Sequence, residues 1–219
     1  MTTNPNSPRT LRGGLVLVDP DTGIAQRIIV LQYNPDTLTR TLQVRNVPAE
    51  GGDRLEALRL TGPPNETIKL DAEIDATDQL EFPEQNPTTV DVGIHPLLAA
   101  LETIVYPSSA TIQLNNGLAA SGTIEIVPIQ APLTLFVWSK ERIMPVNITE
   151  FSITEEAFDP ALNPVRAKVS LGMRVLSTND LIFNTKGASI YMAYLQQKER
   201  LAARNPEGTL SALGITRIP

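Results

Sequence analysis

The segment VRAKVSLGMRV, residues 165–175, carries an apolar side chain at every second position. The positions between them hold Arg, Lys, Ser or Gly. The segment IKLDAEID, residues 68–75, alternates in the same way. A period of two predicts strands with one buried face and one solvated face, which is the pattern of an antiparallel sheet.

The chain on either side of these segments predicts further strands. Residues 15–18 and 24–33 flank the turn cluster DPDTG (19–23), and this arrangement predicts a hairpin. A strand over 38–44 is interrupted by Arg40 on its apolar face, which indicates the edge of a sheet. Other strands are expected at 133–138, at 143–154 with a β-bulge, and at 110–114 and 123–127 around the turn signal Asn115-Asn116-Gly117.

Two segments predict helices. Between residues 95 and 106, apolar residues recur at helical spacing, Pro96 suits the first turn and Pro107 marks the end. A second helix is expected over 188–203, before Asn205-Pro206. The stretches 46–54, 61–66 and 76–92 are expected to be loops by composition.

Together these elements predict an α+β, mostly β fold. We expect a flexible N-terminal arm (1–14), a β domain (15–178), and a C-terminal helix and tail (179–219).

The composition excludes several classes of function. The chain of 219 residues has no Cys and a single His, His95, which excludes thiolate zinc sites, cysteine nucleophiles and a His-relayed centre within the chain. Its net charge of -6 argues against nucleic-acid binding. No phosphate-loop, dinucleotide-binding or nucleophile-elbow motif occurs. We therefore expect a structural or binding protein rather than an enzyme, with no cofactor and no bound metal.

Targeting signals also bear on where the protein works. The first 12 residues lack an apolar signal core, and no apolar run approaches the ~20 residues that span a bilayer. We expect a soluble cytoplasmic protein that does not insert into membranes.

Charged residues on the two clearest strands form the first candidate site. Arg166, Lys168 and Arg174 fall on one face of their strand, and Asp71, Glu73 and Asp75 fall on one face of theirs. In one interpretation the basic residues are a solvated face balanced by nearby acids. In the other they pair with an acidic strip such as Asp71–Asp75 on a neighbouring subunit, or line a channel. The sequence leaves both open.

The second candidate site lies on the C-terminal helix. Tyr191, Tyr194, Leu195 and Leu201 follow one side of the expected helix. Such residues form either a packing stripe or a surface on which a partner docks, and the sequence does not decide between the two.

Several blocks, taken in order, resemble one family. They are QYNPDTLTR (32–40), IKLDAEID (68–75), HPLLAALETIVYP (95–107) and the long stretch from LTLFVWSKERIMP to KVSLGMRVL (133–176). The chain resembles the tube-like N-terminal domain of baseplate proteins from phage-tail-like contractile injection systems, which are often described as LysM-containing. Members of that family join the inner tube to the spike.

The resemblance implies a fold, a role and partners. It implies a tail-tube-like antiparallel β-sandwich or small barrel with one flanking helix, six copies of which form a ring. The implied partners are other copies of the chain, the inner tube or tube-initiator protein, the spike or hub, and baseplate wedge or sheath components. Residues 177–219 show no LysM pattern, so peptidoglycan binding is not implied. The protein would then work in the cytoplasm within a large particle, or be released with it.

Two alternatives remain at this point. One is a tail-tube or tube-initiator subunit of the same kind of machine. The other is a β-sandwich carbohydrate-binding module, which would need exposed aromatic side chains. The single Trp138 sits within an apolar Phe-Val-Trp run, which disfavours that role.

Overall fold

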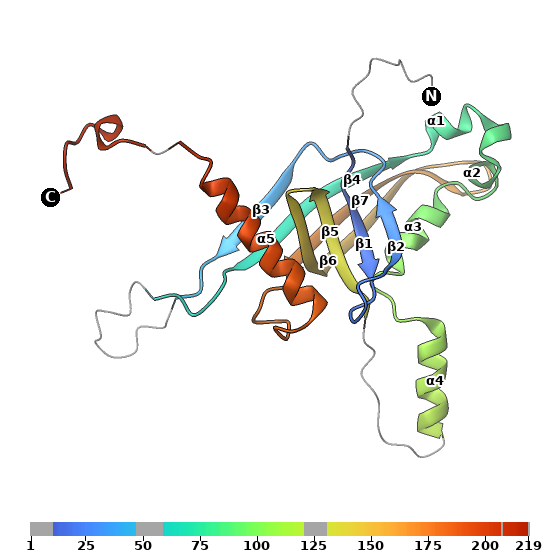
Figure 1. Ribbon diagram of the computed structural model, residues 1–219. Coiled ribbons are helices and arrows are strands. Elements are labelled where there is room, and N and C mark those ends of the chain that lie inside the picture. The colour runs from blue at the N-terminus through green and yellow to red at the C-terminus, as the bar shows by residue number, and fades with distance from the viewer. Residues whose placement is uncertain (1–10, 47–58, 121–130, 207, 219) are drawn as a thin grey trace.

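The computed structural model describes residues 11–46, 59–120, 131–206 and 208–218. Seven strands form one antiparallel sheet in the order β2-β1-β5-β6-β7-β4-β3, accompanied by helices (Figure 1). The α+β, mostly β class expected from the sequence is therefore confirmed. The strands are β1 (Gly14–Val18), β2 (Ala25–Val30), β3 (Leu38–Gln43), β4 (Asn65–Asp75), β5 (Leu133–Ser139), β6 (Arg142–Phe158) and β7 (Pro164–Val175).

The expected N-terminal hairpin is confirmed. Strands β1 and β2 pair antiparallel around the DPDTG turn. There the Asp19 carboxylate accepts the N–H of Thr22 at 2.7 Å, and Gly23 adopts φ 72°, a conformation that glycine takes without steric cost. The polar turn therefore fixes the register that buries Leu15 against Ile29.

Strand β6 joins the two halves of the sheet. Its residues Arg142–Val146 pair with β5, and Val146–Phe158 pair with β7. The register shifts between Ile148 and Glu150, which confirms the expected β-bulge. A bulge bends and twists its strand, so one strand can serve both halves.

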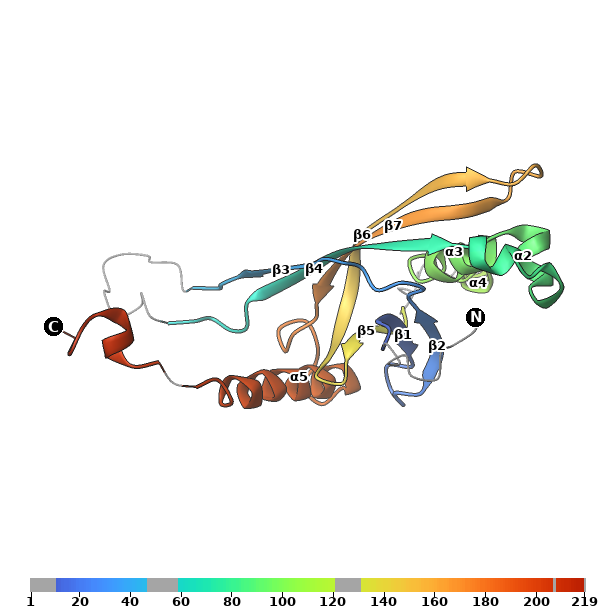
Figure 2. The same cartoon turned by 90° about the horizontal axis from the view of Figure 1, so that it is seen from above.

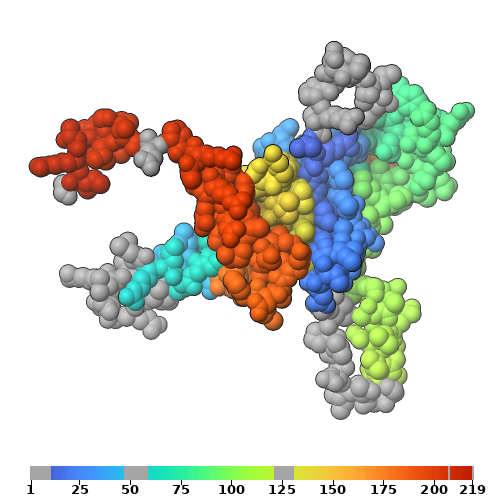
Figure 3. Space-filling view, in the orientation of Figure 1, coloured from blue at the N-terminus to red at the C-terminus, as the bar shows by residue number. Residues whose placement is uncertain are grey.

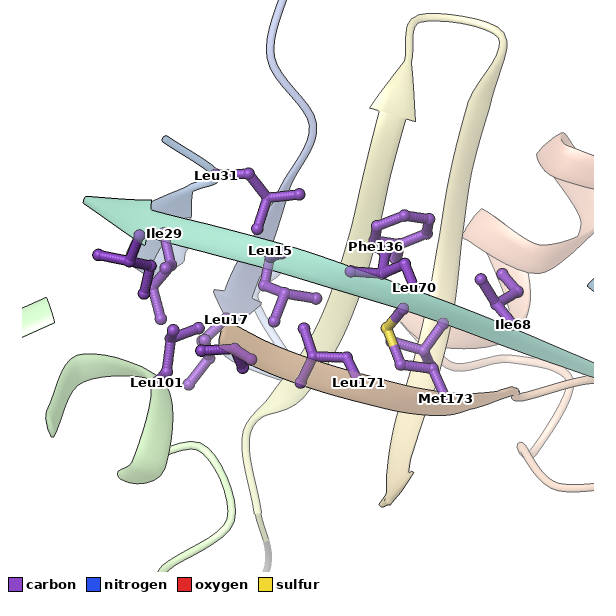
Figure 4. Close-up of a cluster of buried hydrophobic side chains, with 14 of the residues drawn as sticks. Leu15, Leu17, Ile29, Leu31, Ile68, Leu70, Leu101, Phe136, Leu171 and Met173 are labelled. Carbon is purple, nitrogen blue, oxygen red and sulfur yellow. The ribbon is translucent and has the colours of Figure 1, made fainter. Parts of the chain in front are cut away.

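The two halves of the sheet, β2-β1-β5 and β7-β4-β3, face each other across the main core. Leu15 and Phe136 from one half pack with Leu70 and Met173 from the other (Figure 4). The alternating apolar residues of β4 and β7 are buried, as their period predicted. The sheet is thus folded over on itself in a sandwich-like packing, although hydrogen bonds connect all seven strands.

Helix α3 (His95–Glu102) covers part of this core with Leu98 and Leu101. Its start at His95, with Pro96 in the first turn, is as expected, but it ends at Glu102 rather than near Tyr106.

The expectation of a loop over 76–92 was wrong. The segment forms α1 (Thr77–Leu80), the 3-10 turn η2 (Pro83–Gln85) and α2 (Pro87–Val92). Pro83 and Pro87 stand in the first turns of η2 and α2, where a missing N–H costs nothing. Here proline begins helical turns rather than preventing them.

The expectation of a strand at 110–114 with a turn at Asn115-Asn116-Gly117 was also wrong. These residues lie inside helix α4 (Ser109–Ala120). The Ser108 hydroxyl accepts a hydrogen bond from the Thr111 N–H at 3.2 Å and so caps the N-terminus of the helix. The turn signal at Asn115-Asn116-Gly117 gave no indication of this cap. The companion strand expected at 123–127 lies outside the described residues.

The C-terminal helix is confirmed as α5 (Lys186–Ala202), capped by the Thr185 side chain. A short 3-10 turn, η3 (Leu210–Leu213), follows it. From above, the β6–β7 hairpin and α5 extend on opposite sides of the molecule (Figure 2). Within the described residues, no helix is long and apolar enough to cross a membrane.

Candidate functional site

The two charged rows expected from the sequence lie side by side on one face of the sheet. Strands β4 and β7 pair so that Asp75 is opposite Arg166 and Glu73 is opposite Lys168. Asp71 is opposite Ser170 and accepts its hydroxyl hydrogen bond at 2.5 Å. Because side chains directly opposite in a sheet share a face, the rows form one surface.

Each of the three basic residues has an acidic partner within the same chain. Arg166 Nη2 lies 2.8 Å from Asp75 Oδ2, and Arg174 Nη1 lies 2.7 Å from Asp180 Oδ1. Lys168 Nζ lies 3.0 Å from Glu156 Oε1. The structure thus supplies the partners that the first interpretation required, a solvated face balanced by nearby acids.

The pKa values of this face follow from its hydrogen bonds. The Thr77 hydroxyl, the Thr77 backbone N–H and the Arg166 guanidinium together hold the pKa of Asp75 below its ordinary value. The hydrogen bond and charge of Glu156 raise the pKa of Lys168. All of these pairs are partly exposed, so water screens them and each stabilises the fold only weakly.

The charged face continues over the neighbouring strands. Thr39 on β3 is opposite Lys69, and Ser152 on β6 is opposite Ser170. Lys69 Nζ also reaches across to Glu150 Oε2 at 2.7 Å. A groove of about 710 Å³ runs over this surface; its polar lining includes Asp36, Thr37, Asp71, Glu73, Thr154, Lys168 and Ser170. We call the side of β6, β7, β4 and β3 that carries these residues the polar face.

The structure decides between the two roles that the sequence left open for the tyrosines of α5. Tyr191 and Tyr194 are 6% and 4% exposed and belong to the chain's own core. Their rings meet edge to face at 6.5 Å between centroids. Leu195 is half-buried and Leu201 is exposed, so the packing stripe is the role that the tyrosines have. The helical spacing was the correct signal, because it marks the buried side of a helix.

A buried charge cluster beside Tyr194 was missed by the sequence analysis. The side chain of Glu66 on β4 is 5% exposed and accepts hydrogen bonds from Arg40 Nη2 at 2.6 Å and Lys198 Nζ at 2.8 Å. The Tyr194 hydroxyl donates another hydrogen bond at 2.9 Å. The interruption of β3 by Arg40 was the only sequence signal of this cluster.

Burial and hydrogen bonding act oppositely on Glu66. Burial alone would raise its pKa, but the hydrogen bonds from Lys198, Arg40 and Tyr194 outweigh burial and hold the pKa below its ordinary value. Burial and the nearby Glu66 charge raise the pKa of Tyr194, which therefore stays a hydrogen-bond donor. The cluster ties α5 to β3 and β4.

Other chemistry is sparse in the described part of the chain. His95 is exposed at the start of α3. No group of three or more His, Asp or Glu side chains in the described ranges is placed to hold a metal ion. Trp138 is half-buried and stacks on Phe136 with centroids 5.9 Å apart, so it does not form an open aromatic platform.

No protein-family model matches the chain, and no curated protein matches it significantly.

Proposed function

We propose that the protein is a structural baseplate component of a contractile injection system, an adaptor ring that joins the inner tube to the spike. The proposal extends the resemblance of the sequence blocks. The observation that supports it best is a four-stranded ribbon, β6-β7-β4-β3, with two unpaired edges.

The two edges are well defined. Among the described residues, β3 pairs with β4 alone, and β6 beyond Val146 pairs with β7 alone. Beside this part of β6 runs a groove of about 500 Å³ lined by Val105, Tyr106, Ile148 and Phe151. Unpaired strand edges are templates for pairing with another chain.

The faces of the ribbon fit a ring wall. One face is packed into the core, and the polar face carries Thr, Ser and paired charges. When β3 of each copy pairs with β6 of the next, the contact is head-to-tail, and rotation closes it into a ring. The polar face would then line the channel, where it offers a mostly polar surface to a passing shaft. Six copies and the tube and spike partners follow from the resemblance.

Two other functions are weaker candidates. A tail-tube or tube-initiator subunit would use the same edges, but the long β6–β7 hairpin and α5 add more than a plain repeating tube requires. A carbohydrate-binding module would need exposed aromatic residues, and Trp138 is packed against Phe136. An enzymatic role has no supporting cluster of acid, base and nucleophile among the residues described above.

Disulfide trapping tests the ring directly, because the chain contains no Cys. Thr39 and Ser152 are exposed on the polar face of the two edges. Since the register between copies is unknown, cysteine at Thr37, Thr39 or Thr41 should be combined with cysteine at Ser152 or Thr154. The best pair should give a ladder of linked species that ends at a closed ring of six. A variant pairing Gln26→Cys on β2 with Ser152→Cys is the matched control and should give no ladder.

Particles from the native producer test the assignment to the machine. Tagged protein should co-purify with sheath, tube and spike proteins, and negative-stain images should show needle-like particles. A lone protein without the ladder would overturn the proposal.

A further inference from the structure

The groove beside β6 lies on the core side of a strand edge that is unpaired within the described residues. Phe151 lines the groove from β6, and its partner on β7 is Leu171, which is buried in the core. Val105 and Tyr106, which follow α3, also line the groove and are 45% and 67% exposed. When a strand is added to such an edge, its backbone bonds to the edge and its alternate side chains enter the adjoining pocket. The groove therefore has the form of a site for one extended strand with an apolar face.

Strand β3, at the other end of the ribbon, has an apolar side chain on the matching side. Leu42 is opposite Glu66 of β4, which is buried, so Leu42 lies on the core side of β3. It is nevertheless 48% exposed. Its neighbours Thr41 and Gln43 fall on the polar face, because successive side chains of a strand alternate. The core of its own chain thus leaves Leu42 half uncovered at an open edge.

The order of the sheet determines how the two edges would meet. Three antiparallel pairings join β6 to β7, β7 to β4 and β4 to β3, so β3 runs opposite to β6. A rotation about an axis along the strands changes neither the strand directions nor the sides on which the faces lie. In a ring built by such a rotation, β3 of one copy would pair antiparallel with β6 of the next. Leu42 would then lie on the side of β6 that carries the groove.

The charges of the two edges favour this pairing over a pairing of like edges. The segment 38–45 contains Arg40, Arg45 and no acid, whereas residues 147–158 of β6 contain Glu150, Glu155, Glu156 and no basic residue. Part of this charge is balanced within the chain, since Arg40 and Glu150 have partners of their own. Like charges on paired strands are destabilising, and opposite charges select the partner more than they add affinity. The acidic edge therefore favours β3 over a second β6.

The chain's own β3 is not placed to fill the groove. Strand β3 and helix α3 lie on opposite sides of the molecule (Figure 1 and Figure 3). We propose that the groove beside β6 of one copy receives Leu42 from β3 of a second copy. This inference rests on the proposed function, because it names the residues that would join neighbouring copies of the ring.

The groove would also set the register between copies. A slip of one residue moves a side chain from one face of a strand to the other, so it would remove Leu42 from the groove and place it on the polar face. The apolar contact would therefore favour one alignment of β3 on β6 over its neighbours.

Cross-linking of single-cysteine variants tests the contact. Leu42→Cys and Tyr106→Cys are mixed in equal amounts, allowed to assemble and treated with a short bismaleimide, which joins two nearby thiols. We expect the mixed product to predominate. Gln43→Cys is the matched control, because it is exposed on the opposite face of the same strand, and it should give several-fold less mixed product with Tyr106→Cys. Circular dichroism of each variant checks that the sheet is intact.

A second measurement tests whether the contact contributes to assembly. Leu42→Ser and Tyr106→Ser are each introduced into the cysteine pair on the polar face that gives the best disulfide ladder. Each should lower the yield of linked species several-fold, because less apolar surface is buried between copies. Gln43→Ser, the matched control, should leave the yield unchanged. Urea midpoints of the variants show whether any loss comes from unfolding.

The outcomes separate this inference from the proposed function. A normal ladder in Leu42→Ser, together with no cross-link between positions 42 and 106, would overturn the inference and leave the ring standing. A cross-link between these positions with no closed ring would support the groove contact and overturn the ring. A predominant Leu42→Cys homodimer would show that β3 pairs with β3, and a cross-link within one chain carrying both cysteines would show that its own β3 reaches the groove. Either result would overturn the inference.

Discussion

Glu66 and Lys198 are 132 residues apart in the chain, yet Lys198 Nζ lies 2.8 Å from Glu66 Oε2. This ion pair joins β4 to α5, and Lys198 also lies over the Tyr194 ring, 4.1 Å from its centroid. Arg40 approaches the same carboxylate from β3. One buried acid therefore holds three elements together, and this makes α5 part of the folded body.

Removing the Glu66 carboxylate should destabilise the protein strongly. In Glu66→Ala, the charges of Arg40 and Lys198 lose their partner in a partly buried site, and breaking such a pair costs about 3–5 kcal/mol. Urea unfolding followed by circular dichroism measures this loss. Glu150→Ala is the matched control, because its pair with Lys69 is about 60% exposed on both sides. The control should lose much less stability than Glu66→Ala, because exposed ion pairs contribute little. Equal losses in the two variants would contradict the role of the cluster.

Stability should fall in acid because of the same carboxylate. The pKa of Glu66 is lower in the folded chain than its ordinary value of 4.5. Its contribution is therefore fully present above pH 4.5 and is lost as the pH falls through the folded pKa. Urea midpoints between pH 7 and pH 2.5 should decline below pH 4.5. Glu66→Gln should show a shallower decline, while Asp75 and Asp180, whose pKa values are also lowered, keep some slope. An unchanged pH profile in Glu66→Gln would show that other groups control acid unfolding.

The strands could be predicted because their signal is local. The period of two in β4 and β7 predicts which face of each strand is buried, and the DPDTG turn predicts the hairpin of β1 and β2. The β-bulge expected within 143–154 lies between Ile148 and Glu150. The class of the fold followed from these patterns alone.

The misses arose where a local signal has two meanings. Pro83 and Pro87 fit a loop as well as a first helical turn. Asn115-Asn116-Gly117 fits a turn, but the Ser108 cap favours a helix. The buried cluster around Glu66 could not be predicted, because it depends on contacts between residues far apart in sequence.

Gly117 gives a direct test of helix α4. Among the described residues, a Cβ at this position would meet no atom within 4 Å outside the helix's own backbone and its chain neighbours, so Gly117→Ala introduces no clash there. In a helix interior, alanine is favoured over glycine by roughly 0.5–1 kcal/mol. The variant should therefore show slightly higher helicity by circular dichroism. A turn at Asn115-Asn116-Gly117 would instead be weakened by the substitution, and lower stability would contradict the helix.

Gly93 should respond in the opposite way to the same substitution. Its φ is 57°, and a Cβ would lie 2.2 Å from the backbone oxygen of Pro164. The substitution Gly93→Ala must move either α2 or the start of β7, at a cost of roughly 1–3 kcal/mol or more. The expected result is a lower urea midpoint, with Gly117→Ala as the control for the loss of a glycine. A midpoint equal to that of the unmodified protein would show that the junction between α2 and β7 can accommodate a Cβ without loss of stability, which would contradict this prediction.

Arg166 and Asp75 allow the two interpretations of the charged face to be separated. In the fold they pair at 2.8 Å within one chain, and both remain partly accessible to water. Arg166→Asp should therefore lower stability by no more than about 1 kcal/mol. Exchanging the two charges, in Arg166→Asp with Asp75→Arg, should restore the pair.

The yield of assembled rings distinguishes the two interpretations of the charged face. If the polar face lines the channel, no charged group of a neighbouring copy interacts with either side chain. The exchanged variant should then assemble as well as the unmodified chain. If Arg166 instead meets an acidic strip on the next copy, the exchange places two acids together, and assembly should stay blocked although the monomer is folded. Yields of disulfide-trapped rings from the single and the exchanged variants, compared at equal protein concentration, distinguish these outcomes. Recovery in the exchanged variant would assign the Arg166–Asp75 pair to the fold of one chain, and persistent loss would assign Arg166 to the interface.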